Sequence, residues 1–262
     1  MKPCCIKAAF AVLLFSAVGY GQPLKELRQW SGEHALTLPR GESEIGLFSQ
    51  SRHGLTDRVE LGLHPLLFFV LPHAEIKVHA EHGWRWAWGC RARLAYPTWF
   101  LKLVSREGSG GLLPKTSRPP HALQLEGDVI GTLSLGKRQL ASAFLGLAVA
   151  PHQSFTADEL PLLDFPFLYP RFAPLYNGFV PRSTVAFEGP LFSGLHYMAS
   201  ARGYLMLELV DVGTTYALEQ ALTLEYRFER LAVSLGTRAS EAEYPVGFRF
   251  HYLPYFGVRV RL

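Results

Sequence analysis

The last fifteen residues of the chain, 248–262, alternate between apolar and polar side chains with a period of two. Successive side chains of an extended strand point to opposite sides, so this spacing predicts a strand with one apolar face. The apolar face consists of Phe248, Phe250, Tyr252, Pro254, Phe256, Val258, Val260 and Leu262. The opposite face carries Arg249, His251, Leu253, Tyr255, Gly257, Arg259 and Arg261. Such an apolar face needs an apolar surrounding, either a protein core or a lipid bilayer.

Long apolar runs are missing after residue 22. The longest are 66–71 and 140–150, whereas a transmembrane helix needs about 20 apolar residues. Charged residues make up 18% of the chain, against roughly 25% in an ordinary soluble domain, which indicates a non-aqueous neighbour. A chain that spans a bilayer without helices must close its strands into a barrel, so that every backbone group is paired. The length suits one such all-β domain.

Two further alternating stretches, on either side of the turn His82-Gly83-Trp84, predict a hairpin. A three-residue loop centred on glycine would place Glu81 opposite Arg85 and Glu75 opposite Arg91. Opposite charges across an antiparallel pair stabilise it, and glycine suits such a loop. Turn chemistry, alternation and charge therefore predict one register.

Nine more segments have the composition or alternation of strands. They are Glu44–Gln50, Asp57–Phe69, Pro97–Val104, Leu123–Leu135, Arg138–Ala150, Ser183–Ala201, Arg202–Val210, Thr215–Glu229 and Leu231–Arg238. Bacterial single-chain barrels have an even number of strands. We therefore expect a closed antiparallel transmembrane β-barrel of about 10 to 12 strands.

Two long connections, about 105–120 and 151–181, follow the fifth and seventh expected strands. Both are odd-numbered, so they lie at the same end, which we take as extracellular because outer-membrane barrels have long loops outside and short turns inside. The second connection interleaves prolines with aromatic residues and cannot form a central strand. We expect it to form a lid, a constriction or a partner-binding surface at the barrel mouth.

The first 21 residues have the layout of a secretory signal peptide. Lys2 and Lys7 precede an apolar stretch, and small residues allow cleavage after Gly19 or Gly21. We therefore expect residues 1–21 to be removed, residues 22–41 to form a periplasmic segment, and residues 42–262 to form the barrel. Cys90 is the cysteine left in the mature chain, and we interpret it as a small buried or lipid-facing side chain.

The C-terminal run Gly257-Val258-Arg259-Val260-Arg261-Leu262 resembles the terminal strand of Gram-negative bacterial outer-membrane β-barrel proteins. In that class, glycine is followed by alternating hydrophobic residues up to the end of the chain, although an aromatic residue is more usual there than Leu262. The resemblance implies location in the outer membrane, contact with outer-membrane lipid, and a terminal strand read by the barrel assembly machinery. Its signal residues would be Gly257, Val258, Val260 and Leu262.

Alternation also predicts which charged side chains face the barrel lumen. They are Glu60, Glu75, Lys77, His79, Glu81, Arg85, Arg91, Arg93, Glu225, Arg227, Arg249, His251, Arg259 and Arg261. Because the first and last strands meet, the basic residues of the last strand should lie near Glu42 and Glu44. These charges either pair and fill a narrow barrel or form a porin-like ring that selects small solutes, with a weak preference for anions.

The preferred function is a non-catalytic outer-membrane protein, either a small channel or a structural or surface-interaction protein. One alternative is a membrane-embedded lipid hydrolase of the Ser/His type, and another is a soluble periplasmic lipid-binding barrel with its apolar face inward. No catalytic motif, cofactor motif or metal-ligand spacing is present, and the small positive charge does not indicate nucleic acid. The hydrolase reading has as candidates His64, His79, His196, Ser49, Ser51, Ser193 and Ser200.

Overall fold

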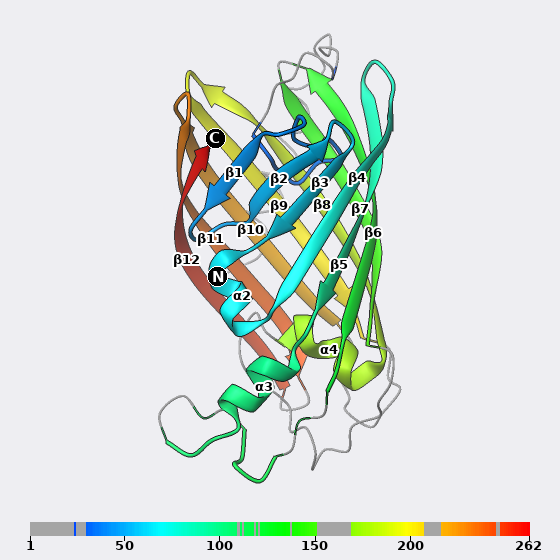
Figure 1. Cartoon of the computed structure of the whole chain (residues 1–262), viewed down its shortest axis with the longest axis vertical. Coiled ribbons are helices and arrows are strands. Elements are labelled where there is room, and N and C mark those ends of the chain that lie inside the picture. Colours follow the sequence, from blue (N-terminus) through cyan, green and yellow to red (C-terminus); the bar gives the residue numbers. More distant parts are fainter. Residues whose placement is uncertain are drawn as a thin grey trace.

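A computed structural model shows a closed barrel of twelve antiparallel strands (Figure 1). Each strand pairs with its neighbours in the sequence, and β1 pairs with β12 to close the barrel. The structure describes residues 24, 30–108, 111, 113–117, 119, 121–136, 138–150, 169–206, 216–244 and 247–262. The expected signal peptide lies outside the described residues. The predicted fold class is confirmed.

The strands differ greatly in length around the barrel. The first three are short: β1 Ser43–Gly46, β2 Ser51–Thr56 and β3 Val59–Leu63. The others are β4 His73–His82, β5 Trp86–Ala95, β6 Gln124–Gly136, β7 Gln139–Val149, β8 Phe179–Phe192, β9 Leu195–Leu205, β10 Tyr216–Arg227, β11 Leu231–Tyr244 and β12 Gly247–Arg261. The described residues between strands form three helices: α2 Pro65–Val70, α3 Thr98–Val104 and α4 Tyr169–Asn177.

The two faces of the barrel wall have opposite polarity. On β3, Glu60 points inward and is 1% exposed, while its neighbour Leu61 points outward and is 42% exposed. On β12, Phe250 and Phe256 point outward and are largely exposed, as the alternation predicted. Cys90 is also exposed, on the outer face of β5. A polar interior inside an apolar exterior is the reverse of a soluble lipid-binding barrel, so that alternative is wrong.

The connections have different lengths at the two ends of the barrel. Strands β2 and β3, β4 and β5, β6 and β7, β8 and β9, and β10 and β11 are joined by short turns at one end. The helices α2, α3 and α4 belong to the connections at the other end, which we call the helix end (Figure 1). The predicted placement of both long connections at one end is therefore confirmed. None of the helices in the described ranges is long and apolar enough to cross a membrane.

The predicted register of the β4–β5 hairpin is wrong. Up to His79 it differs by two residues, so Glu75 lies opposite Arg93 and Lys77 opposite Arg91. A shift of two residues leaves these side chains on the same face of the sheet, so alternation cannot detect it. Past a bulge between His79 and Glu81 it differs by three, and Glu81 lies opposite Trp88 rather than Arg85. The bulge adds a residue to one strand and disrupts the ladder locally.

Several predicted strand boundaries are also wrong. The segment 97–104 is the helix α3 rather than a strand, and the apolar stretch before residue 71 forms α2. His64 caps α2 by accepting the Leu67 N–H at its Nδ1, and Pro65 occupies the first turn. The turn between β8 and β9 lies at Gly194, whose φ is 78°, and not near Gly203. Short apolar runs suit buried helices and strands equally, which explains these errors.

Candidate functional site: an occluded lumen

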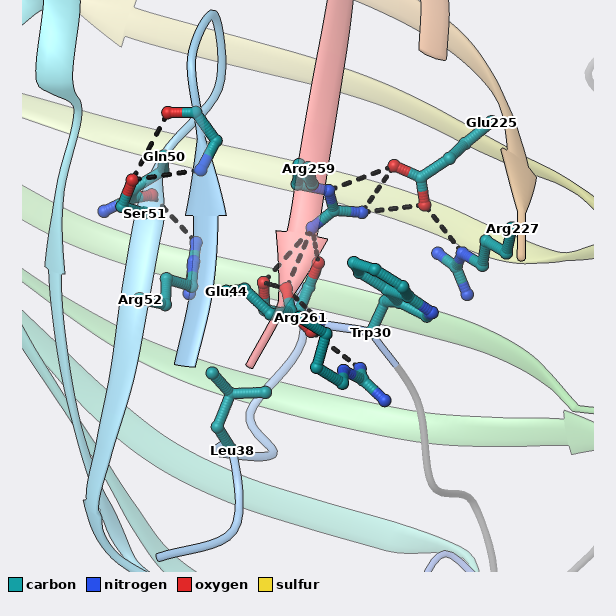
Figure 2. A network of polar contacts seen from close by, with 12 residues as sticks. Trp30, Leu38, Glu44, Gln50, Ser51, Arg52, Glu225, Arg227, Arg259 and Arg261 are labelled. Atoms are coloured by element: carbon teal, nitrogen blue, oxygen red, sulfur yellow. Dashed lines mark hydrogen bonds and ion pairs between the residues drawn. The ribbon is translucent and has the colours of Figure 1, made fainter. Parts of the chain in front are cut away.

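The seam where the barrel closes is held by a network of ion pairs on the lumen side (Figure 2). Glu44 on β1 is 0% exposed and accepts from Arg259 at 3.2 Å and from Arg261 at 2.6 Å. Arg259 also reaches Glu225 on β10, and Arg227 joins the same carboxylate at 2.6 Å. The predicted contact of the last strand with Glu44 is therefore confirmed for Arg259 and Arg261.

Glu60 on β3 forms a second inward-facing group. Its carboxylate lies 2.7 Å from the Arg52 guanidinium and 3.1 Å from the Lys77 ammonium. Its second oxygen accepts the backbone N–H of Leu38 at 2.9 Å. Buried charges are tolerated only when they are paired and hydrogen-bonded, which this arrangement achieves.

A third group spans β5, β6 and β8. Arg182 on β8 donates twice to Asp128, at 2.8 Å each, and also reaches Glu126. Arg91 donates to the same Asp128 at 2.9 Å. Arg93 lies at the margin, 4.0 Å from Glu126. These pairs join β5 and β6 to β8, on the far side of β7, through their lumen-facing side chains.

Residues 30–38, which precede the first strand, lie inside the barrel. We call them the inner segment. The backbone N–H of Ser31 donates to Glu44 at 3.1 Å, and the N–H of Ala35 donates to Thr132 at 2.9 Å. The periplasmic position expected for residues 22–41 stays a prediction, but this described part of them contacts the lumen wall. The inner segment therefore fills space that a solute would need.

Trp30 anchors the inner segment against the closing strand. Its ring lies under the guanidinium of Arg261 at 4.4 Å and that of Arg259 at 5.4 Å (Figure 2). Arg259 also donates to the carbonyl of Ser31 at 2.7 Å. Cation–π stacking of this kind is worth about 2 kcal/mol when it is shielded from water. The same arginines thus close the barrel and hold the inner segment.

Glu33 places a negative charge among the lumen arginines. Its carboxylate lies 3.6 Å from Arg91 and 3.9 Å from Arg202. Burial alone would raise the pKa of Glu33, but the surrounding positive charges, Arg91 first, outweigh it and lower the pKa to about 2. Glu33 is therefore ionised at neutral pH and attracts the wall electrostatically.

His34 is the most deeply buried titratable group of the inner segment. Its Nε2 lies 3.6 Å from Glu188 and 3.4 Å from the carbonyl oxygen of Trp30. Burial, followed by the positive charge of Lys77, lowers the pKa of His34 to about 3. The imidazole is therefore neutral in this position at physiological pH.

The helix end of the lumen is closed by a different kind of contact. Helix α4 enters the barrel mouth, where Arg171 forms a bidentate pair with Glu219 on β10, and Phe172 packs against Phe100 of α3 at 5.7 Å. This apolar cluster contains Leu71, Ala95, Phe100, Leu101, Val104, Leu113, Ala122, Ala150, Phe172, Ala173, Leu175, Tyr176, Val180, Tyr204, Met206, Ala217 and Ala242. The described part of the 151–181 connection thus lies at the mouth.

Most of the charged residues predicted to face the lumen lie there. Buried side chains are Glu60, Glu75, Lys77, His79 and Glu225. Partly buried ones are Arg85, Arg91, Arg93, Arg227, His251, Arg259 and Arg261, whereas Glu81 and Arg249 are exposed near the strand ends. The role of this set in selecting solutes stays a prediction.

Sequence reasoning missed several residues that complete the lumen. Glu126 and Asp128 alternate on β6 as clearly as the chosen residues do, so the same rule could have found them. The inner segment has no alternation and no motif, so nothing local indicates that it lies inside the barrel. Other missed lumen residues are Arg52, Arg171, Arg182, Glu188, Arg202, Glu219 and Arg238.

The serine and histidine residues proposed for a hydrolase do not pair with one another among the described residues. His64 caps α2, and His196 lies 3.1 Å from Arg227. A different pair does form: the Ser43 hydroxyl lies 2.8 Å from Nδ1 of His53 on the exposed outer face. Within the described residues, no cluster of three His, Cys, Asp or Glu side chains is arranged to hold a metal ion.

Comparison with known proteins gives likenesses of fold. No family model matches the sequence, and no curated protein is found similar to it. Among solved structures, OmpT of Vibrio cholerae is 13% identical with a TM-score of 0.46, and covers 81% of this chain and 63% of its own. The outer membrane channel DcaP of Acinetobacter baumannii is 8% identical with a TM-score of 0.41, covering 93% and 68%.

A third similar structure is the outer membrane protein opdK of Pseudomonas aeruginosa, 14% identical with a TM-score of 0.39, covering 86% of this chain and 58% of its own. The chain thus spans less than two thirds of the length of the OmpT and opdK structures. All three are Gram-negative outer-membrane proteins, and the likeness extends to the barrel class only.

Proposed function

We propose that this protein is an integral outer-membrane barrel that conducts small solutes and that its inner segment, residues 30–38, holds the lumen shut in the state described. The observation that carries the proposal is the inner segment itself, which crosses a polar lumen and is held mainly by hydrogen bonds and ion pairs. Contacts of this kind exchange readily with water, so the segment is suited to leave.

Location in the membrane is supported by the outward-facing side chains. Leu145, Val129 and Leu235 are 71%, 59% and 67% exposed on strands of the outer wall. A soluble protein rarely leaves such a belt in water. The terminal residues Gly257, Val258, Val260 and Leu262 remain our prediction for the signal read by the assembly machinery. A folded barrel of this class should resist SDS until boiled and then shift on the gel.

Conductance of a variant lacking residues 30–38 tests the gate. We expect the full chain in a planar bilayer to be closed for most of the recording and the deletion variant to be open. Because lumen-facing arginine and lysine side chains slightly outnumber carboxylates among the described residues, the reversal potential in a KCl gradient should show preference for chloride. A folded deletion variant that stays closed would instead support a structural anchor.

A lipid hydrolase is the second candidate because Ser43 and His53 lie within hydrogen-bond distance on the outer face. Nucleophilic serine normally needs a histidine that a third group orients. No described residue hydrogen-bonds to Nε2 of His53, which weighs against this function. Release of fatty acid from phosphatidylethanolamine vesicles by the wild type, abolished in S43A, would establish it.

A further inference from the structure

The wall of the barrel is incomplete on one side at the helix end. Strand β12 has fifteen residues, but β1 pairs with only Arg259, Val260 and Arg261 of them. Beyond Val258, whose carbonyl accepts the Leu47 N–H, no described strand pairs with β12 on the side away from β11. Helix α2 stands between β12 and β4 where longer strands would otherwise run (Figure 1).

The backbone of β12 shows which groups this unpaired edge presents. Leu262 and Val258 bond toward β1, while Arg261 bonds toward the start of β11, so even-numbered residues direct their backbone groups to the open side. Pro254 is even-numbered and has no N–H to leave unpaired, and proline in sheets is confined to such edges. The sequence of β12 is therefore compatible with an edge that stays open.

A cavity of about 250 Å³ lies directly behind this edge. One side of it is formed by Phe48, Ser49 and His64, which belong to the β1–β2 turn and the start of α2. The other side is formed by Arg238 of β11 and Tyr255 of β12. The inner segment and strands β8, β9 and β10 also contribute to its lining, so the cavity is the part of the lumen that lies behind the opening. Its volume suits a headgroup but not a whole lipid.

Arg238 is the cavity's distinctive charge. The guanidinium lies 6.0 Å from the centre of the Tyr255 ring, and no described residue forms a hydrogen bond or ion pair with it. Its cavity neighbours Arg52, Arg227 and Arg259 are all paired with carboxylates. His64 adds a neutral imidazole, because burial and the nearby charges of Arg93 and Arg238 lower its pKa. Glu33, Glu188 and Glu225 line the same cavity, and Arg238 is the cation of this lining that no described carboxylate pairs with.

The surface around the opening is apolar. Leu253 lies on the lumen-facing side of β12, opposite Arg238. Its side chain is 48% exposed, so no neighbouring part of the barrel packs fully over it. Phe250 of β12 and Phe69 of α2 are 60% and 74% exposed on the two sides. An acyl chain leaving the cavity would meet these side chains rather than water.

We propose that this opening, bounded by β12, the β1–β2 turn and α2, is a lateral portal that admits an amphiphile from the bilayer, with its anionic headgroup on Arg238 and its acyl chain along the outer wall. The inference requires the membrane location proposed above but not the gated channel. A guanidinium recognises carboxylate and phosphate alike. The probe for the test is therefore a simple anionic amphiphile.

Binding of spin-labelled stearate tests the portal in phosphatidylcholine nanodiscs. We expect a motionally restricted stearate population with the full chain. R238Q should bind stearate at least about tenfold more weakly, because a charge-assisted hydrogen bond is lost. R238K, which keeps the positive charge, should restore much of the binding. R58Q, at the exposed turn between β2 and β3, is the matched control and should bind as the wild type does. Equal binding of stearate methyl ester, or full competition by inorganic phosphate alone, would overturn the amphiphile site.

A second measurement does not depend on Arg238 variants that fold. Two proteins without residues 1–21 are labelled with bimane, one at F250C in a C90S background and one at the native Cys90, which lies on the outer face of β5. Stearate that is spin-labelled near its carboxylate should quench the bimane at position 250 more than the bimane on Cys90. Equal quenching would contradict the portal. If the protein shows no heat-dependent gel shift, it has not inserted as a barrel, and this result would count against the membrane location. The two failures are therefore distinguishable.

Discussion

The two ends of the lumen are closed in different ways. At the helix end, α3 and α4 contribute to an apolar cluster of seventeen described residues. We call the opposite end, where short turns join the strands, the turn end. There the inner segment is held by carboxylates and guanidinium groups, and the associated apolar cluster has six described residues. Burial of apolar surface is insensitive to pH and salt, whereas ion pairs respond to both. The helix end is therefore suited to permanent closure and the turn end to reversible closure.

The largest effect is expected from E44Q, which changes the residue shared by the barrel seam and the inner segment. Arg261 would lose the carboxylate that lies 2.6 Å from it, and Arg259 would lose one of its two carboxylates and keep Glu225. Breaking a buried ion pair in this way costs about 3–5 kcal/mol. We expect a marked fall in the urea midpoint of the barrel in detergent micelles. E81Q, at an exposed strand end, serves as the control and should leave the midpoint unchanged.

L101A should break the helix end without opening the lumen. Leu101 is 0% exposed in the apolar cluster, and truncating such a side chain costs about 2–5 kcal/mol. The unfolding midpoint should fall, while the conductance of the folded fraction stays that of the closed wild type. A large rise in conductance would show that the helix end is the gate and would reverse the comparison.

W30L should act on the turn end alone. Leucine preserves apolar bulk but removes the stacking on Arg259 and Arg261, worth about 2 kcal/mol. We expect the open fraction in single-channel recordings to rise roughly thirtyfold, with little change in the unfolding midpoint of the barrel. Unchanged gating with a lowered midpoint would mean that Trp30 stabilises the fold rather than the closed state.

The sequence predicted the barrel far better than it predicted the closed lumen. Period-two alternation is a direct consequence of strand geometry, so the lumen-facing residues of β4 and β12 could be read from their spacing. The β4–β5 register could not be predicted, because a shift by two residues preserves both faces and because nothing in the alternation indicates the bulge between His79 and Glu81. The position of the inner segment could not be predicted, because its contacts join residues far apart in the sequence. Ala35 and Thr132, for example, are 97 positions apart. Only the folded wall brings such partners together.

Acidification should favour release of the inner segment from the lumen. Near neutral pH this effect should be smaller than those of the three substitutions. The pKa of His34 is lowered to about 3 in the lumen by burial and by Lys77, with Arg52 acting in the same direction and Glu60 opposing it. Released into water, His34 regains a pKa near 6.5. Below that value the released state binds a proton that the seated state does not, so each pH unit favours release about tenfold.

Glu33 should cause a second response to pH, at lower pH than that of His34. Its pKa of about 2 in the lumen returns to about 4.5 on release, so falling pH acts on it only below that value, and again towards release. H34Q should therefore abolish the rise in conductance between pH 6.5 and 4.5 but keep a rise below 4.5. E33Q should keep the rise between pH 6.5 and 4.5 and make the rise below 4.5 less steep, because His34 still acts there. Conductance that does not change from pH 7 to 4 in the wild type would show that the inner segment is a fixed part of the wall, and the polar and apolar ends would then be equally permanent.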